Sequence, residues 1–146
     1  MRKLLFLAVS AFLLLSSCDN DDNSEPTVLG TWKMTKEMYI SGKDNSIFDS
    51  TPYSACKSQS NFVFAADNTA TFSQYDLNGT TCTLKNSSNF TYSYDSKTKT
   101  LTLDANNTQE SYVLNSLTDN EMQILTNTDD YNDDGIDDKS VIVFNK

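Results

Sequence analysis

The chain has 146 residues, of which 20 are acidic and 11 basic, and its net charge is −9. A surface of this charge repels nucleic acid and anionic lipid headgroups, so the sequence argues against both as partners. The sequence contains no histidine, which excludes Ser-His-Asp and Cys-His catalysis and His-based zinc sites. No pair of carboxylates stands out as catalytic either, and we therefore expect a protein that is not an enzyme.

The N-terminus has the pattern of an export signal. Two basic residues precede an apolar run over residues 4–15, and two serines stand before Cys18. This pattern indicates a secretory signal peptide; a membrane-spanning helix is the alternative, although a span needs about 20 apolar residues. Residues 15–18, Leu-Ser-Ser-Cys, resemble the lipobox of bacterial lipoproteins. The resemblance implies that residues 1–17 are removed and that lipidated Cys18 anchors the chain to a bilayer, whereas a plain secretory signal would leave this cysteine free.

The segment after the cysteine is polar and acidic. Residues 18–27 are therefore expected to form the lipidated cysteine and a flexible tether, followed by one domain over residues 28–146. The acidic run also resembles the surface-export signal of Bacteroidota lipoproteins. That resemblance implies an outer-membrane lipoprotein exposed on the cell surface; a simple linker would leave the domain facing the periplasm.

Two further cysteines remain once Cys18 is assigned to lipid. Cys56 and Cys82 form an even pair in an exported chain, and an oxidising compartment favours a disulfide between them. Two free thiols or a pair of metal ligands are the alternative, which the lack of histidine disfavours.

From Val28 onward the apolar residues alternate with a period of two, with almost no helical signal. About eight short strands without crossover helices are expected, a pattern typical of an antiparallel sandwich or barrel. Residues 41–60 are expected to be a polar loop, because Gly42 and Pro52 interrupt them. The expected strands are Gly30–Ile40 and residues 62–64, 70–75, 90–94, 100–103, 111–114, 122–125 and 141–144. In the strand over residues 100–103, Leu101 and Leu103 are expected to face inward.

The first expected strand opens with Leu-Gly-Thr-Trp at residues 29–32, and Gly-x-Trp at this place resembles the lipocalin signature. The rest of the chain is similar to the lipocalin-like lipoprotein domains of Bacteroidota. The matching segments are residues 56–64, 65–69, Cys82, 90–94, 101–103 and 117–119. The resemblance implies an all-β, antiparallel, up-and-down barrel of eight strands over residues 28–146. It also implies that Trp32 closes one barrel end; a ligand-binding role is the alternative.

Such a barrel encloses a small ligand or fills its interior with side chains. Aromatic residues on the inward faces of the expected strands are candidates for a pocket that holds a small apolar or amphipathic molecule. Core packing explains the same stripe without a ligand. The candidates are Phe62, Phe64, Phe72, Phe90, Tyr92, Tyr94 and Tyr112.

The sequence between the last two expected strands contains a local motif for calcium. Residues 130–138 follow the pattern D-x-N-x-D-G-x-x-D, the first nine positions of a calcium-binding loop, and resemble the loops of dockerins and thrombospondin-type repeats. Position 12 is Val141 rather than glutamate, so weak affinity is expected. The alternative is an acidic hairpin loop. The predicted ligands are Asp130, Asn132, Asp134, Ile136 through its carbonyl, and Asp138.

Two functions follow from these observations. The first is a membrane-anchored lipocalin-like protein that binds a small apolar or amphipathic ligand without catalysis. The second is a structural or interaction protein of the cell surface, with a filled barrel and a calcium-stabilised loop. The volume of the barrel interior distinguishes them, because a ligand needs a cavity of about 300 Å³ or more.

Overall fold

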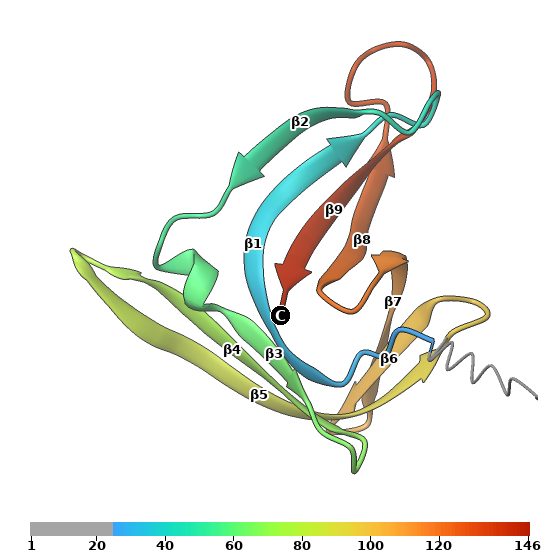
Figure 1. Cartoon of the computed structure of the whole chain (residues 1–146). Helices are drawn as coiled ribbons and strands as arrows, with labels where there is room; N and C mark the ends of the chain where they lie inside the picture. Colours follow the sequence, from blue (N-terminus) through green and yellow to red (C-terminus); the bar gives the residue numbers. More distant parts are fainter. Residues whose placement is uncertain (1–24) are drawn as a thin grey trace, which may run out of the picture.

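A computed structural model describes residues 25–146 of the chain. The predicted signal peptide, Cys18 and most of the predicted tether lie outside the described residues. The described part forms one antiparallel sheet with a short 3₁₀ helix (Figure 1). Its elements are β1 (Gly30–Ile40), β2 (Ile47–Pro52), η1 (Lys57–Gln59), β3 (Asn61–Phe64), β4 (Thr69–Asn78), β5 (Thr81–Asp95), β6 (Thr100–Ala105), β7 (Thr108–Leu117), β8 (Glu121–Asp129) and β9 (Asp138–Asn145).

The sheet closes into a ring because β1 pairs with three other strands. Residues 30–33 of β1 pair with β3, residues 36–40 pair with β2, and residues 33–40 pair with β9 on the other edge. The strand order is β2-β1-β3-β4-β5-β6-β7-β8-β9, and the β1–β9 pairing completes it. Eight strands therefore form the closed ring, with β2 attached outside it. The predicted all-β, antiparallel, lipocalin-like barrel is confirmed.

The segment 41–60 differs from the polar loop that the sequence predicts. It contains β2 and η1, so the described chain has nine strands instead of eight. Every residue of β2 is exposed, and the strand is held by main-chain pairing with β1. A strand without a buried face has no hydrophobic alternation, which is why its sequence gave no strand signal.

The barrel interior is filled from alternating positions of neighbouring strands. Trp32 of β1 pairs across the ladder with Phe62 of β3, and Phe62 pairs with Phe72 of β4. On the opposite wall, Tyr94 of β5 pairs with Leu101 of β6. Cross-strand neighbours in an antiparallel sheet share a face, so these side chains point into one interior. A second, smaller buried cluster comprises Met38, Ile40, Val141 and Val143.

The wall between β7 and β8 is only partly closed. Residues 114–117 of β7 pair with residues 122–124 of β8, but the first half of β7 pairs with β6 alone and the second half of β8 with β9 alone. A register shift marks the point of separation in each strand. Figure 1 shows the result: the C-terminal ends of β1 and β8 and the N-terminal ends of β2 and β9 lie together at the top of the view. We call this part of the sheet the upper lobe.

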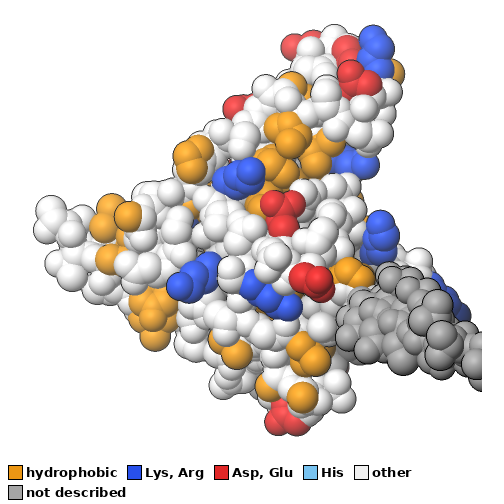
Figure 2. Space-filling view, viewed as in Figure 1, with side chains coloured by type: hydrophobic (Ala, Val, Ile, Leu, Met, Phe, Trp, Pro, Cys, Tyr) orange, Lys and Arg blue, Asp and Glu red, His pale blue; other side chains and the backbone are white. Residues whose placement is uncertain are grey.

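The tip of the upper lobe brings together the β1–β2 turn and the loop before β9 (Figure 1). Figure 2 shows acidic side chains at this tip and hydrophobic side chains lower on the same lobe. Within residues 25–146, no helix is long and apolar enough to span a bilayer.

Candidate functional site

A largely apolar cavity of about 300 Å³ lies inside the barrel. Residues from β1 and β3 through β9 line it, so all eight ring strands contribute to its walls. The lining residues are Met34, Phe62, Phe72, Phe90, Leu101, Leu103, Glu110, Tyr112, Ile124, Thr126, Ile142 and Phe144. The volume lies at the lower end of the range of about 300–1,000 Å³ that small-molecule sites occupy.

Polar groups lie where β7 and β8 separate. Glu110 and Tyr112 are on β7, in the half that does not pair with β8, and Thr126 is on the facing part of β8. Glu110 pairs across the ladder with Leu103, and Tyr112 with Leu101. Both side chains therefore share the face of buried leucines. Glu110 and Thr126 are exposed, which places the polar end of the cavity next to solvent.

Glu110 and Tyr112 interact directly. The Tyr112 hydroxyl donates a hydrogen bond to the Glu110 carboxylate. Partial burial, together with this bond and the negative charge of Glu110, raises the pKa of Tyr112 to about 12. The phenol therefore stays protonated at neutral pH and keeps donating to the carboxylate.

The aromatic residues that the sequence proposes as a pocket are only partly brought together. Four of them line the cavity: Phe62, Phe72, Phe90 and Tyr112. Phe64 is buried and stands edge-on to Tyr92, whose hydroxyl donates to the Ala65 carbonyl at 2.9 Å. Tyr94 lines a separate surface hollow of about 290 Å³ with Pro26 and Leu117.

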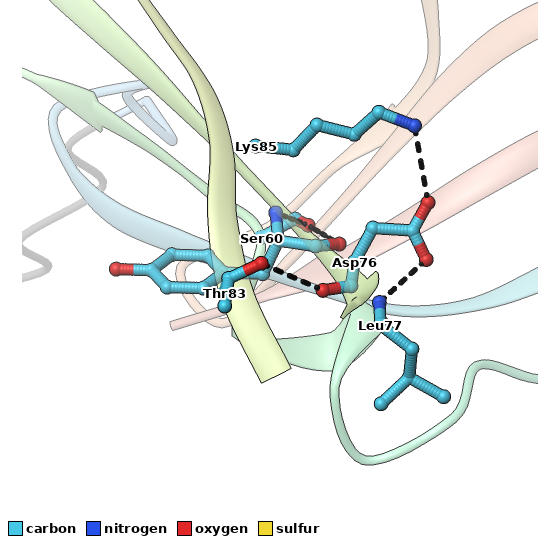
Figure 3. Close-up of polar contacts among 6 residues, drawn as sticks. Ser60, Asp76, Leu77, Thr83 and Lys85 are labelled. Atoms are coloured by element: carbon cyan, nitrogen blue, oxygen red, sulfur yellow. Dashed lines mark hydrogen bonds and ion pairs between the residues drawn. The ribbon is translucent and has the colours of Figure 1, made fainter. Parts of the chain in front are cut away.

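A polar hollow of about 240 Å³ adjoins the cavity and shares Met34 and Phe72 with it. Figure 3 shows its polar framework. The buried Ser60 hydroxyl accepts a hydrogen bond from the Tyr75 main-chain N–H at 2.9 Å, and Lys85 lies 3.5 Å from the Asp76 carboxylate. The Leu77 N–H and Lys85 both lower the pKa of Asp76. The Ser60 bond fixes β4 against the end of η1, and the Lys85 contact joins β4 to β5.

Trp32 is fully buried near the start of β1. Its indole Nε1 donates to the Val28 carbonyl at 2.6 Å, and the Lys146 ammonium lies 4.5 Å from its ring centroid. Trp32 thus contacts both Val28, which lies just before β1, and Lys146 after the end of β9. The closing of one barrel end by Trp32 stays a prediction.

The predicted disulfide is confirmed. Cys56 and Cys82 are bonded, with their Cα atoms 5.4 Å apart. Cys56 precedes η1, and Cys82 lies in β5 opposite Leu77 of β4. The bond therefore ties the β4–β5 hairpin to the segment that leads from β2 into β3.

The loop over residues 130–138 is held by its own polar side chains. The Asp130 carboxylate accepts hydrogen bonds from the N–H groups of Asp134 and Gly135, at 3.0 and 2.8 Å. Asn132 Oδ1 also accepts from Asp134 N–H, and Asp134 Oδ1 accepts from Ile136 N–H, both at 3.0 Å. Asp138 is fully buried and accepts from the N–H groups of Gly42 and Tyr131.

These bonds orient the carboxylates towards main-chain N–H groups. Across residues 25–146, no three or more acidic or cysteine side chains are grouped so that they could hold a metal. Calcium binding by Asp130, Asn132, Asp134, Ile136 and Asp138 stays a prediction, and it requires these side chains to exchange some of their present bonds for the ion.

The predicted pocket residues included neither the aliphatic lining of the cavity nor Glu110 and Thr126 at its polar end. Leu101 and Leu103 were expected to face inward, and they do so as cavity lining. Glu110 gave no signal, because an isolated glutamate in a polar stretch looks like any exposed residue. Only the pairing of Glu110 with Leu103 reveals that it shares the inward face.

The barrel and its cavity agree with the comparisons with known proteins. A family model described as a lipocalin-like domain matches residues 28–124. None of the curated proteins compared with the chain matches it. The matched segment runs from Val28, two residues before β1, into β8 and includes most of the cavity wall. The chain belongs to the lipocalin-like domain family.

Proposed function

We propose that this protein binds one small apolar or amphipathic molecule inside its barrel, without catalysis. The observation that carries the proposal is the cavity of about 300 Å³, whose walls are built mainly of aromatic and aliphatic side chains. Transfer of apolar ligand surface into such a cavity is favourable, by about 25 cal/mol for each Å² removed from water. A few polar groups at one end would fix the orientation of the ligand.

We further propose that lipidated Cys18 anchors the barrel to the outer membrane of a bacterium of the Bacteroidota, on the cell surface or otherwise facing the periplasm. The support comes from the sequence: an apolar run, a lipobox-like Leu-Ser-Ser-Cys and an acidic stretch directly after it. One acyl chain gives only marginal membrane binding, whereas two or more hold a protein firmly. A disulfide suits an exported protein as well.

Native mass spectrometry of protein purified from its own host tests both proposals. A lipidated N-terminal cysteine would appear as a covalent mass increase on a chain that starts at Cys18. A bound ligand would appear as a mass that is lost on denaturation. Repeated preparations without ligand, together with failure of added 1-decanol to bind, would contradict the binding function.

One observation favours the second candidate, an interaction protein of the cell surface. The upper lobe exposes Ile47, Phe48 and Ile136, each with more than 40% of its surface accessible. Tyr39 contacts Phe48 and Tyr131, with ring centroids 6.2 and 4.8 Å apart. Exposed apolar groups of this kind occur at protein contact sites. Co-sedimentation of the wild type, but not of Phe48→Ser, with host cell envelopes from a strain lacking the protein would support this role.

A further inference from the structure

Glu110 is the one charged residue among those that line the cavity. The other lining groups are aromatic or aliphatic, except for the hydroxyl of Thr126. Glu110 lies on the inward face opposite Leu103, at the polar end where β7 has left β8. A ligand that fills the apolar part of the cavity would therefore bring its own polar end close to this carboxylate.

The Glu110 carboxylate has capacity for a further donor. An ionised carboxylate carries two oxygens with about four acceptor positions, and the Tyr112 hydroxyl occupies one of them. The Thr126 hydroxyl across the opening donates to the Ser140 carbonyl at 3.0 Å. The polar end of the cavity thus presents acceptors rather than free donors to a ligand.

The neighbouring charged groups strengthen the preference of the site for a ligand that donates hydrogen bonds. Glu37 of β1 pairs across the ladder with the cavity residue Ile142, and its carboxylate accepts a hydrogen bond from Ser140 at 3.2 Å. The nearest basic group in the adjoining hollow is Lys57. Its ammonium lies 4.1 Å from the Tyr53 ring centroid, and the same hollow holds the acidic Asp76. A ligand carboxylate would meet Glu110 at the opening, the negative charge of Glu37 on the adjoining strand, and a lysine that already has partners.

From these contacts we propose that the ligand is a cationic amphiphile, an apolar body that carries a protonated amine. The apolar body fills the cavity, and the ammonium group donates to Glu110. The aromatic rings of Phe72, Phe90 and Tyr112 line the same space and add cation–π attraction. This inference rests on the proposed binding function and narrows it, because it disfavours fatty acids.

Three probes with one decyl chain test the inference: 1-decylamine, 1-decanol and decanoate. Isothermal titration calorimetry at neutral pH and low salt measures the affinity of each for the protein. Decylamine should bind about tenfold more tightly than decanol, a difference of about 1.4 kcal/mol, because a hydrogen bond between an ammonium and a carboxylate is stronger than one made by a neutral hydroxyl. Decanoate should bind more weakly than either. Added salt should weaken the binding of decylamine and leave that of decanol nearly unchanged.

The Glu110→Gln variant removes the charge and keeps an acceptor for Tyr112. It should weaken decylamine binding about tenfold, strengthen decanoate binding and leave decanol binding unchanged. The matched control is Glu121→Gln, because Glu121 lies at the β7–β8 turn and does not line the cavity. It changes the net charge equally and should leave all three affinities as in the wild type.

The outcomes separate this inference from the proposed function. Equal affinities for the three probes, tighter binding of decanoate, or an equal response of both variants would overturn the preference for an amine while the apolar site remains. If none of the three probes binds, the proposed binding function fails as well.

Discussion

The main-chain N–H of Gly42 donates a hydrogen bond to the buried carboxylate of Asp138 at 3.0 Å, across 96 residues of sequence. This bond joins the β1–β2 turn to the start of β9 at the tip of the upper lobe (Figure 1). A Cβ at Gly42 would overlap the Asp137 carbonyl oxygen. The two segments therefore meet only because residue 42 has no side chain.

Gly42→Ala should destabilise the protein by roughly 2–3 kcal/mol, since overpacking against fixed main chain forces a backbone shift. Urea unfolding followed by circular dichroism measures this loss. Gly79→Ala is the control: nothing lies within 4 Å of an added Cβ there, and its φ of +63° costs about 1 kcal/mol for alanine. Equal losses in the two variants would contradict the close contact at Gly42.

Replacing both Cys56 and Cys82 with serine should lower the free energy of unfolding by roughly 3–4 kcal/mol. The bond closes a loop of 26 residues, and the loss of that constraint on the unfolded chain gives this magnitude in the chain-entropy model. Urea unfolding of the double variant and of the wild type in dithiothreitol should agree. Identical midpoints for the oxidised and reduced wild type would argue against a stabilising disulfide.

Stability should fall as the pH rises from about 10 to about 12. Burial first, and then the charge of Glu37, raises the pKa of Tyr53 to about 12, and Tyr112 has a pKa raised equally. In this window the unfolded tyrosines lose protons that the folded ones retain, so alkali favours unfolding. Urea midpoints measured across this range should fall less steeply for Tyr53→Phe/Tyr112→Phe. Parallel pH profiles for the variant and the wild type would be inconsistent with the raised pKa values.

Millimolar calcium should raise the melting temperature if the loop over residues 130–138 binds the ion. Asp134→Asn keeps an acceptor for the Ile136 N–H and removes one charge from the predicted ligand set, so this variant should lose the shift. Asp119→Asn, in the turn between β7 and β8, should retain it. Differential scanning calorimetry of metal-free protein, before and after calcium is added, measures the shift for the wild type and both variants. An unchanged melting temperature of the wild type would contradict calcium binding and would mean that the loop is only a hydrogen-bonded hairpin loop.

The sequence predicted those parts of the fold in which burial alternates along a strand. Leu101 and Leu103 in β6 were expected to face inward, and they line the cavity. The strand β2 has no buried residue, so its pairing with β1 could not be predicted from hydrophobic periodicity. The ring closure between β1 and β9 depends on residues far apart in the sequence, and only the family resemblance pointed to it.

The candidate site was predicted by residue type more than by position. Aromatic residues on the inward faces indicated a ligand pocket, yet Phe64 is packed against Tyr92 and does not line the cavity. The distinction between core and cavity depends on how neighbouring side chains fill space, which a single sequence does not encode in its pattern. The inward position of Glu110, the charged residue of the cavity lining, could be recognised only from its cross-strand pairing with Leu103.

Nuclear Overhauser effects between 1-decanol and protein methyl groups test most directly whether an apolar ligand occupies the barrel interior. We predict contacts from the decyl chain to the methyl groups of Leu103, Ile124 and Ile142, which line the cavity. We predict none to Leu84, which is 51% exposed and does not line the cavity. Contacts to Leu84 without any to the three cavity residues would contradict the account.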